Sequence, residues 1–303
     1  MTDIFEHLKN KNISPSSLKL YLSNLKRLND NNEIKNFNFL KNTESILNKL
    51  KQYKDNTRRT YIISIVSLLK QEPKYKKQYE FYYKLLTDLN SDLKTNTTKS
   101  ETQNENWISQ DEVKEIYNKL ESDILDKVKN KKKLDATTYN ELLDYLILSF
   151  YVLMPPRRCL DYQSMKFVKH FNEELDKQFN YLDLSTFKMY FNRYKTSKTY
   201  QCKEIDVNDE LKKVIQLYLK FYPLKKEMDG QFIIVDNKGE HSTSINYITR
   251  VLNRIFKAKI SVSMLRNIYL TSKYSDKVNE LNDDVKAMGT SSGVAMNQYI
   301  KTD

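Results

Sequence analysis

Glycine, cysteine and histidine are scarce in this chain of 303 residues, with four, two and three copies respectively. Four glycines provide no phosphate-binding loop of the GxxxxGK type, which argues against a nucleotide-driven enzyme. Cys159 and Cys202 form no CxxC pair and have no histidine at ligand spacing, so we expect neither a disulfide nor a zinc site. The histidines are scattered along the chain, and we therefore expect a reaction that needs no metal and no cofactor.

Long apolar runs are also absent. The longest, residues 142–154, contains Asp144 and is far shorter than the ~20 residues that span a bilayer. The N-terminus lacks the basic and then apolar pattern of a secretory signal. We therefore expect an intracellular protein that does not enter a membrane.

Basic residues outnumber acidic ones. The 51 lysines and arginines against 39 aspartates and glutamates give a net charge of +12 and a pI near 9.3. Such an excess favours a polyanionic partner, either nucleic acid or an anionic membrane surface. The length is sufficient for two domains with separate hydrophobic cores.

Residues 1–95 have the pattern of a small helical bundle. Ser14 is a good N-cap and Pro15 suits the first helical position, where its missing N–H costs nothing. Three further amphipathic segments follow, at 44–53, from 56 to the proline at 73, and at 79–93. Residues 96–106 are polar and lack apolar periodicity, which is typical of a linker between domains.

Residues 107–303 predict a second, mixed domain. The most apolar helix of the chain, residues 142–151, is expected at its centre. The pattern then alternates loosely from 181 to 207, which indicates a short antiparallel ribbon with a lysine in its turn. Helices are expected at 209–221 and 244–257, separated by a strand-like segment at 231–235. The predicted fold class is mainly α with a small antiparallel β-sheet.

Four residues of this second domain together fit one reaction. A tyrosine can attack a phosphodiester if its phenol loses its proton and the charge of the transition state is neutralised. Arginine guanidiniums bind two phosphate oxygens at once, and a lysine can protonate the leaving 5′ oxygen. The sequence has candidates for each role, at Arg158, Lys198, Arg266 and Tyr299. The phosphotyrosyl product keeps the bond energy, so rejoining needs no cofactor.

The first of these segments resembles a known family. Arg158-Cys-Leu-Asp161 follows the apolar helix and fits the Arg-x-x-Glu/Asp motif of the tyrosine recombinases, or phage integrase family, which the chain resembles over nearly its whole length. The form Pro-Pro-Arg-Arg-x-Leu-Asp-Tyr is similar to that of recombinases in large DNA viruses and their virophages. The alternative arginine, Arg157, is interpreted as a surface residue or a simple phosphate contact.

The other motifs follow in the family's order. Lys198-Thr-Tyr resembles the Lys-Thr-Gly of the family's β-hairpin, with Lys195 as the alternative. Ser263-Met-Leu-Arg266 is similar to its His-x-x-Arg. The resemblance implies that Arg158 and Arg266 neutralise the phosphate and that the lysine is the general acid.

The last motif is Met288-Gly-Thr290-Ser, which resembles the family's Leu-Gly-His-Ser. Thr290 precedes Tyr299 by nine residues, as the family's histidine precedes its nucleophile. Hydroxyl residues thus replace both histidines, at Ser263 and Thr290. Each can donate a hydrogen bond to phosphate but cannot act as an imidazole base, and a nearby lysine such as Lys286 is a possible substitute.

Each residue also has an ordinary structural interpretation. Arg158 would cap the preceding helix, Lys198 would be a solvated turn residue, Arg266 would pair with an acidic neighbour, and Tyr299 would be one of 22 tyrosines that pack. The four residues keep the order and spacing of the family's motifs. This agreement favours the chemical interpretation over four separate structural roles.

The resemblance implies a two-domain clamp around double-stranded DNA, with residues 1–95 on one face and 107–303 on the other. We expect site-specific recombination or integration by a homo-oligomer, a dimer or tetramer, on paired DNA sites. For a viral protein the location would be the host nucleus or a cytoplasmic viral factory. Two alternatives remain, a type IB topoisomerase and a DNA-binding relative with impaired catalysis.

Overall fold

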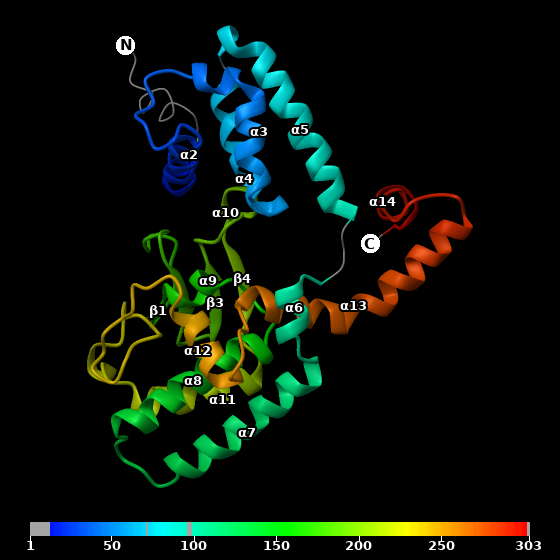
Figure 1. The fold of residues 1–303 in the computed structure, drawn as a ribbon. Helices are drawn as coiled ribbons and strands as arrows, with labels where there is room; N and C mark the ends of the chain where they lie inside the picture. The colour runs from blue at the N-terminus through cyan, green and yellow to red at the C-terminus, as the bar shows by residue number, and fades with distance from the viewer. Residues whose placement is uncertain (1–12, 71, 96–98, 302–303) are drawn as a thin grey trace. The chain divides into compact units, whose positions relative to one another are not determined.

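The computed structural model describes residues 13–70, 72–95 and 99–301. The contacts divide the chain into two compact units, with the boundary between Lys99 and Ser100. Each unit has its own hydrophobic core. The mainly helical character predicted from the sequence is confirmed (Figure 1).

The described part of the first unit contains helices and connecting loops but no strand. Its helices are α2 (Pro15–Leu28), α3 (Thr43–Lys51), α4 (Asp55–Leu69) and α5 (Lys76–Thr95), with 3-10 turns η1 (Asn38–Lys41) and η2 (Pro73–Tyr75) between them. Ser14 accepts a hydrogen bond from the Ser17 N–H, as expected of an N-cap. Helix α4 is the centre of the core, since it packs on α2, α3 and α5.

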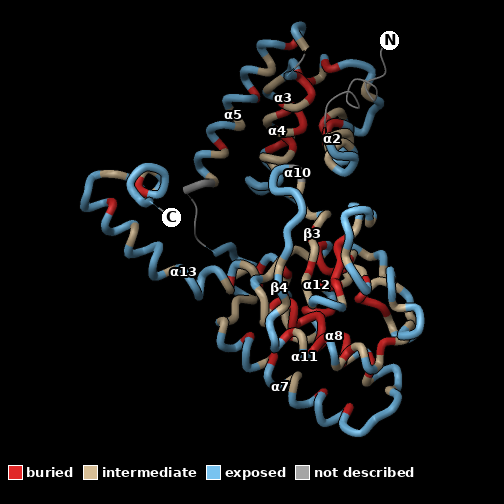
Figure 2. The backbone as a smooth tube through the Cα atoms, turned by 180° about the vertical axis from the view of Figure 1, so that it is seen from behind, coloured by how far each residue is buried: buried red, intermediate tan, exposed pale blue. Residues whose placement is uncertain are grey.

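The second unit begins with three helices, α6 (Glu101–Asn106), α7 (Gln110–Val128) and α8 (Ala136–Val152). The expected capping box of Ser109 and Glu112 starts α7. Helix α8 is buried over most of its length, and α7, α11 (Asp209–Phe221) and α12 (Tyr247–Phe256) pack on it (Figure 2). The apolar helix predicted at the centre of this domain is therefore confirmed.

A four-stranded sheet follows the five-residue helix α9 (Cys159–Gln163). Its strands lie in chain order, β1 (Met165–Val168), β2 (Asn180–Asp183), β3 (Lys188–Phe191) and β4 (Lys203–Asp206). The pairs β2–β3 and β3–β4 are antiparallel, which agrees with the predicted ribbon. However, β1 pairs with β2 in parallel, so the sheet is mixed and the predicted antiparallel sheet is wrong in this respect.

The C-terminal part contains one long helix. After η3 (Lys225–Glu227) and α12 comes α13 (Val262–Ala287), then the short α14 (Ser292–Val294) and the π-helical turn η4 (Ala295–Tyr299). Figures 1 and 2 both show α13 leaving the body of the unit, with α14 beside its far end. No helix in the described ranges is long and apolar enough to cross a membrane.

Two segments differ from the sequence-based expectations. Residues 101–106, which belong to the predicted linker, form α6, because Ser100 and Gln103 make a capping box that polar composition alone does not reveal. The strand-like segment 231–235 makes only one isolated bridge, between Phe232 and Lys166 of β1. Ile233, Ile234 and Val235 are buried in the core, which explains the strand-like pattern.

Asp183, at the end of β2, holds the turn into β3. Its carboxylate accepts hydrogen bonds from the backbone N–H groups of Phe171, Ser185 and Thr186 and from the Ser185 hydroxyl. Burial alone would raise the pKa of Asp183, but these hydrogen bonds outweigh it and lower the pKa to about 2.

We predict that Asp183→Asn lowers the free energy of unfolding at pH 7 by about 2 kcal/mol. The carboxylate stabilises the fold fully above its ordinary pKa of 3.8, and this stabilisation is lost as the pH falls through about 2. The difference between variant and wild type should therefore narrow from pH 7 to pH 3 in urea unfolding. An equal difference at both pH values would contradict the role of the charge.

Candidate functional site

A pocket of about 330 Å³ lies where three distant segments of the second unit meet. The segments are the connection from α8 to α9, the β3–β4 hairpin, and the start of α13. Both predicted arginines, Arg158 and Arg266, line it. The full lining is Met154, Pro155, Pro156, Arg157, Arg158, Asp161, Tyr162, Met189, Phe191, Tyr194, Thr196, Ile205 and Arg266.

The two prolines and Arg157 fix the backbone that presents Arg158. Helix α8 ends at Val152, and Pro155 and Pro156 prevent its continuation. Arg157 is not the surface residue predicted from the sequence. Its Nε donates to Oδ2 of Asp161 at 3.0 Å, and its guanidinium carbon lies 3.8 Å from the centre of the Phe191 ring.

This ion pair neutralises the one carboxylate among the lining residues. Asp161 is only 3% exposed. Burial raises the pKa of Asp161, and the positive charges of Arg157 and Arg158 partly offset that rise. Because Arg157 is already paired with Asp161, the pocket keeps the charges of Arg158 and Arg266 in excess.

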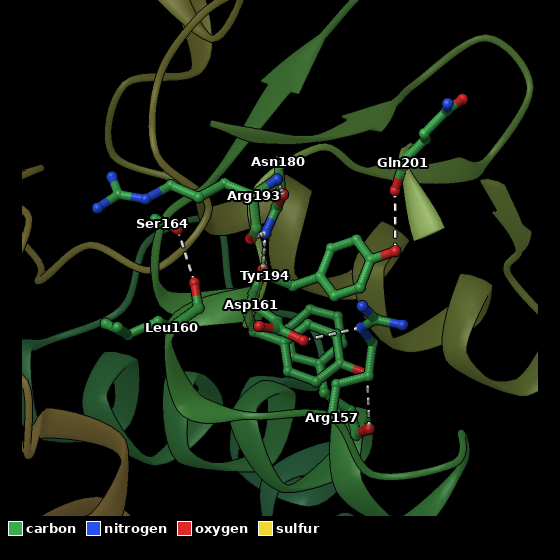
Figure 3. A network of polar contacts seen from close by, with 10 residues as sticks. Arg157, Leu160, Asp161, Ser164, Asn180, Arg193, Tyr194 and Gln201 are labelled. Atoms are coloured by element: carbon green, nitrogen blue, oxygen red, sulfur yellow. Dashed lines mark hydrogen bonds and ion pairs between the residues drawn. The ribbon is translucent and has the colours of Figure 1, made fainter. Parts of the chain in front are cut away.

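Asn180, which sequence reasoning missed, joins the two walls of the pocket (Figure 3). Its side-chain amide is fully buried at the start of β2 and donates to the carbonyls of Asp161 and Arg193. Its Oδ1 accepts from the Arg193 N–H at 2.8 Å. A buried amide with three hydrogen bonds, to Asp161 and Arg193, holds α9 and the residues that follow β3 in a fixed relative position. An asparagine within a short apolar stretch was the only sequence signal.

Arg266 is placed by the buried first turns of α13. Ser261 caps the helix by accepting from the Met264 N–H. Val262, Met264, Leu265 and Ile268 are buried in the core of the unit. These contacts leave Arg266 half-buried at the pocket rather than free at the surface.

Neither guanidinium has the partner that its structural interpretation requires. Within the described part of the chain, the side chains of Arg158 and Arg266 make no hydrogen bond and no ion pair. The expected alternatives, a helix cap for Arg158 and an acidic partner for Arg266, are therefore not observed. Both arginines are positively charged and line one pocket, so the pocket suits an anionic ligand.

The segment that carries the predicted lysine also contributes residues to the lining of this pocket. Lys198 belongs to the helical turn α10 (Ser197–Tyr200), in the segment that joins β3 to β4, and its side chain is outside the described part of the structure. Thr196 and Tyr194 of the same segment line the pocket, and Lys195 between them is exposed. The choice between Lys198 and Lys195 stays a prediction.

The remaining predicted residues are not in the pocket. Ser263 is exposed, one helical turn before Arg266 on α13. Thr290 and Tyr299 lie beyond the far end of α13, and Tyr299 is 58% exposed. From Arg266 to Ala287 the helix continues without a break, and its axis rises by about 30 Å between these two residues. The structure therefore brings together the two arginines but not the tyrosine of the same chain.

Two other tyrosines do line the pocket. Burial raises the pKa of Tyr162 well above its usual value, which disfavours its phenolate. The Tyr194 hydroxyl donates to the carbonyl of Gln201 at 2.8 Å, as Figure 3 shows. Neither phenol is therefore as accessible as that of Tyr299.

Comparison with known proteins found no family model that matches the chain, no similar curated protein and no similar solved structure. Among the described residues, no group of three or more histidines, cysteines and carboxylates could hold a metal ion.

We predict that the three arginines of the pocket differ in their effect on stability. Arg157→Ala leaves Asp161 as an unpaired buried charge and should lower the free energy of unfolding by about 3 to 5 kcal/mol. Arg158→Ala and Arg266→Ala remove side chains that make no hydrogen bond or ion pair among the described residues, and each should change this free energy by less than about 0.5 kcal/mol. Urea unfolding of the three variants measures this. Destabilisation by all three alike would show that Arg158 and Arg266 have structural partners.

Proposed function

We propose that this protein is a DNA strand transferase that cleaves and rejoins DNA through a covalent 3′-phosphotyrosyl intermediate. Arg158 and Arg266 bind the scissile phosphate, and Tyr299 is the nucleophile. The reaction class is site-specific recombination or integration.

One observation carries the proposal. Two arginines separated by more than one hundred residues in sequence line the same pocket, and the side chain of neither makes a hydrogen bond or an ion pair among the described residues. Because neither charge is used in an ion pair among the described residues, both arginines are free to bind an anionic ligand at the pocket. A phosphate diester fits, because two forked guanidiniums can together bind both of its non-bridging oxygens.

The chemistry balances without a cofactor. The Tyr299 phenol gives its proton to a base, for which water or the uncharged amine of Lys286 is the candidate, and its oxygen forms a bond to phosphorus while the bond from phosphorus to the 5′ oxygen breaks. That oxygen leaves as a hydroxyl after it takes a proton from Lys198 or Lys195. Rejoining reverses each step, with the 5′ hydroxyl as nucleophile. Arg158 and Arg266 stabilise the additional negative charge of the transition state in both directions.

The net charge of +12 supports a polyanionic substrate. The separation of Tyr299 from the pocket of its own chain favours a second candidate, a DNA-binding protein without catalysis. The hydroxyl residues Ser263 and Thr290, in place of two histidines, favour the same candidate. Covalent trapping decides between the two.

We predict that the wild-type protein forms a covalent adduct with a pool of duplexes that carry a nick close to the point of cleavage. Cleavage beside the nick releases a short fragment with the 5′ hydroxyl, and without this fragment the strand cannot be rejoined. The adduct should survive denaturation, and peptide mapping should locate it on Tyr299. Tyr299→Phe should abolish it, because no phenol oxygen remains. Arg158→Ala and Arg266→Ala should each reduce its rate by roughly 10²- to 10³-fold.

Tyr83→Phe is the matched control, since this tyrosine is 52% exposed and belongs to the first unit. It should form the adduct at the wild-type rate. An adduct mapped to Tyr194 would contradict the role of Tyr299. Adduct without recombinant products, but with relaxation of supercoiled DNA, would indicate a topoisomerase instead.

We also predict salt-sensitive DNA binding. Between 50 and 200 mM salt the affinity should fall roughly 10²- to 10³-fold, as expected for about four to six phosphate contacts. Arg158→Ala should lower the slope of log affinity against log salt by about one. Fluorescence anisotropy with a labelled duplex measures both. An affinity that is nearly independent of salt would contradict binding through phosphates.

A further inference from the structure

One side-chain hydrogen bond closes the turn that carries both predicted lysines. Residues 192–202 join β3 to β4 and include the helical turn α10. The Tyr194 hydroxyl donates to the Gln201 carbonyl at 2.8 Å, seven positions further along the chain (Figure 3). Lys195 and Lys198 both lie between these two residues. The bond therefore encloses either candidate for the general acid.

Gln201 has a strained backbone. Its φ of 52° and ψ of −156° lie at the edge of a region that is favourable only for glycine. The cost of such a conformation is comparable to the net stabilisation by one or two hydrogen bonds. Gln201 makes two, since its N–H donates to the Ser197 carbonyl at 2.8 Å and its carbonyl accepts from Tyr194. Loss of either bond is thus enough to let this residue relax.

The ring of Tyr194 is itself held in place. The guanidinium carbon of Arg157 lies 5.1 Å from the centre of this ring, and Arg157 is fixed by its ion pair with Asp161. The preceding residue, Arg193, is bound through both of its backbone groups by the buried Asn180. The hydroxyl of Tyr194 is therefore presented to the turn from the wall of the pocket.

Few other interactions hold the turn. Its remaining hydrogen bonds join backbone groups within residues 194–201. Tyr200 is 60% exposed, and Lys195 is exposed as well. Among the described side chains, that of Tyr194 is the only one with a hydrogen bond to residues 195–201. The conformation of the turn thus depends on a single tyrosine hydroxyl.

We propose that Tyr194 is a positioning residue whose hydroxyl holds residues 195–201 in the conformation that presents the general acid to the leaving 5′ oxygen. This inference rests on the proposed function. It applies to Lys198 and to Lys195 alike, because both are enclosed by the same hydrogen bond. Tyr194 acts through the Gln201 carbonyl, while the lysine ammonium gives its proton to the 5′ oxygen as the bond from phosphorus to that oxygen breaks.

Removal of the hydroxyl should misplace the acid without removing it. Gln201 would relax to a negative φ, and the turn that ends at this residue would change its path. A displacement of about 1 Å at a catalytic group can lower a rate by roughly 10²-fold. Arg158 and Arg266 would keep their positions, because they belong to other segments of the pocket. The defect should therefore be confined to protonation of the leaving group.

Tyr194→Phe tests the inference on two substrates, since it removes the hydroxyl and keeps the ring against Arg157. The first substrate is the set of nicked duplexes that trap the wild type. On these duplexes the variant should form the adduct roughly 10- to 100-fold more slowly than the wild type, because the acid is present but misplaced.

The second substrate removes the need for an acid. Its duplexes carry sulfur in place of the 5′ oxygen at the cleavage point mapped with the wild type. Because a thiol is a much stronger acid than an alcohol, the sulfur leaves as a thiolate without taking a proton. On these duplexes Tyr194→Phe should form the adduct at the wild-type rate. The double variant Lys195→Ala, Lys198→Ala should show the same pattern, with a larger defect on oxygen.

Tyr190→Phe is the matched control. Tyr190 lies on the face of β3 opposite to Phe191, and its ring stacks on that of Phe171. This variant loses a hydroxyl from the same hairpin but not from the pocket. It should form the adduct at the wild-type rate on both substrates.

Hydrogen exchange of the protein without DNA provides an independent test. The Gln201 amide is protected by its bond to the Ser197 carbonyl, and in Tyr194→Phe it should exchange roughly 5- to 10-fold faster than in the wild type. Tyr190→Phe should leave this rate unchanged. Wild-type exchange of the Gln201 amide in Tyr194→Phe would overturn the inference, whatever the result with DNA.

The two substrates also separate the ways in which the inference can fail. Equal slowing of Tyr194→Phe on oxygen and sulfur would indicate damage to phosphate binding, and wild-type rates on both would show that the hydroxyl has no role. Either result would overturn the inference while leaving the proposed function intact. Complete loss of adduct on both substrates would instead identify Tyr194 as the nucleophile. Absence of adduct in the wild type would contradict the proposed function, and the inference with it.

Discussion

The buried ion pair between Arg157 and Asp161 is the interaction on which the pocket depends. It neutralises a carboxylate that burial would otherwise make costly, and it places Arg157 against Phe191 of the sheet. The side chain of its neighbour Arg158 makes no hydrogen bond or ion pair among the described residues. Two adjacent arginines thus divide the tasks, with one holding the wall of the pocket and the other providing its charge.

The sheet and the long helix α13 set the rest of the geometry. The buried amide of Asn180 fixes the residues that follow β3 to α9, and the buried first turns of α13 place Arg266 at the same pocket. The same helix then carries the C-terminal segment away, because nothing in residues 269–287 breaks it. The single long helix α13 therefore explains both why Arg266 lies at the pocket and why Tyr299 lies far from it.

Local features of this fold could be predicted from the sequence. The helix starts could be predicted from the capping residues Ser14 and Ser109, and the central helix α8 from its apolar pattern. The order of the motifs predicted that Arg158 and Arg266 share a site. Non-local features could not be predicted. The parallel pairing of β1 with β2 depends on a loop without a periodic signal, and the position of Tyr299 depends on the direction of α13. The prediction that Arg157 is a surface residue is wrong because Asp161, the acidic residue of the Arg158 motif, pairs with Arg157 in the fold.

The central claim is that Arg158 and Arg266 bind one and the same phosphate. The most direct measurement is an experimental structure of the protein bound to a nicked duplex. The account predicts a DNA phosphate in the pocket, with nitrogens of both guanidiniums within about 3 Å of its non-bridging oxygens. A bound duplex whose phosphates contact neither guanidinium, with the pocket empty or covered by protein, would contradict it.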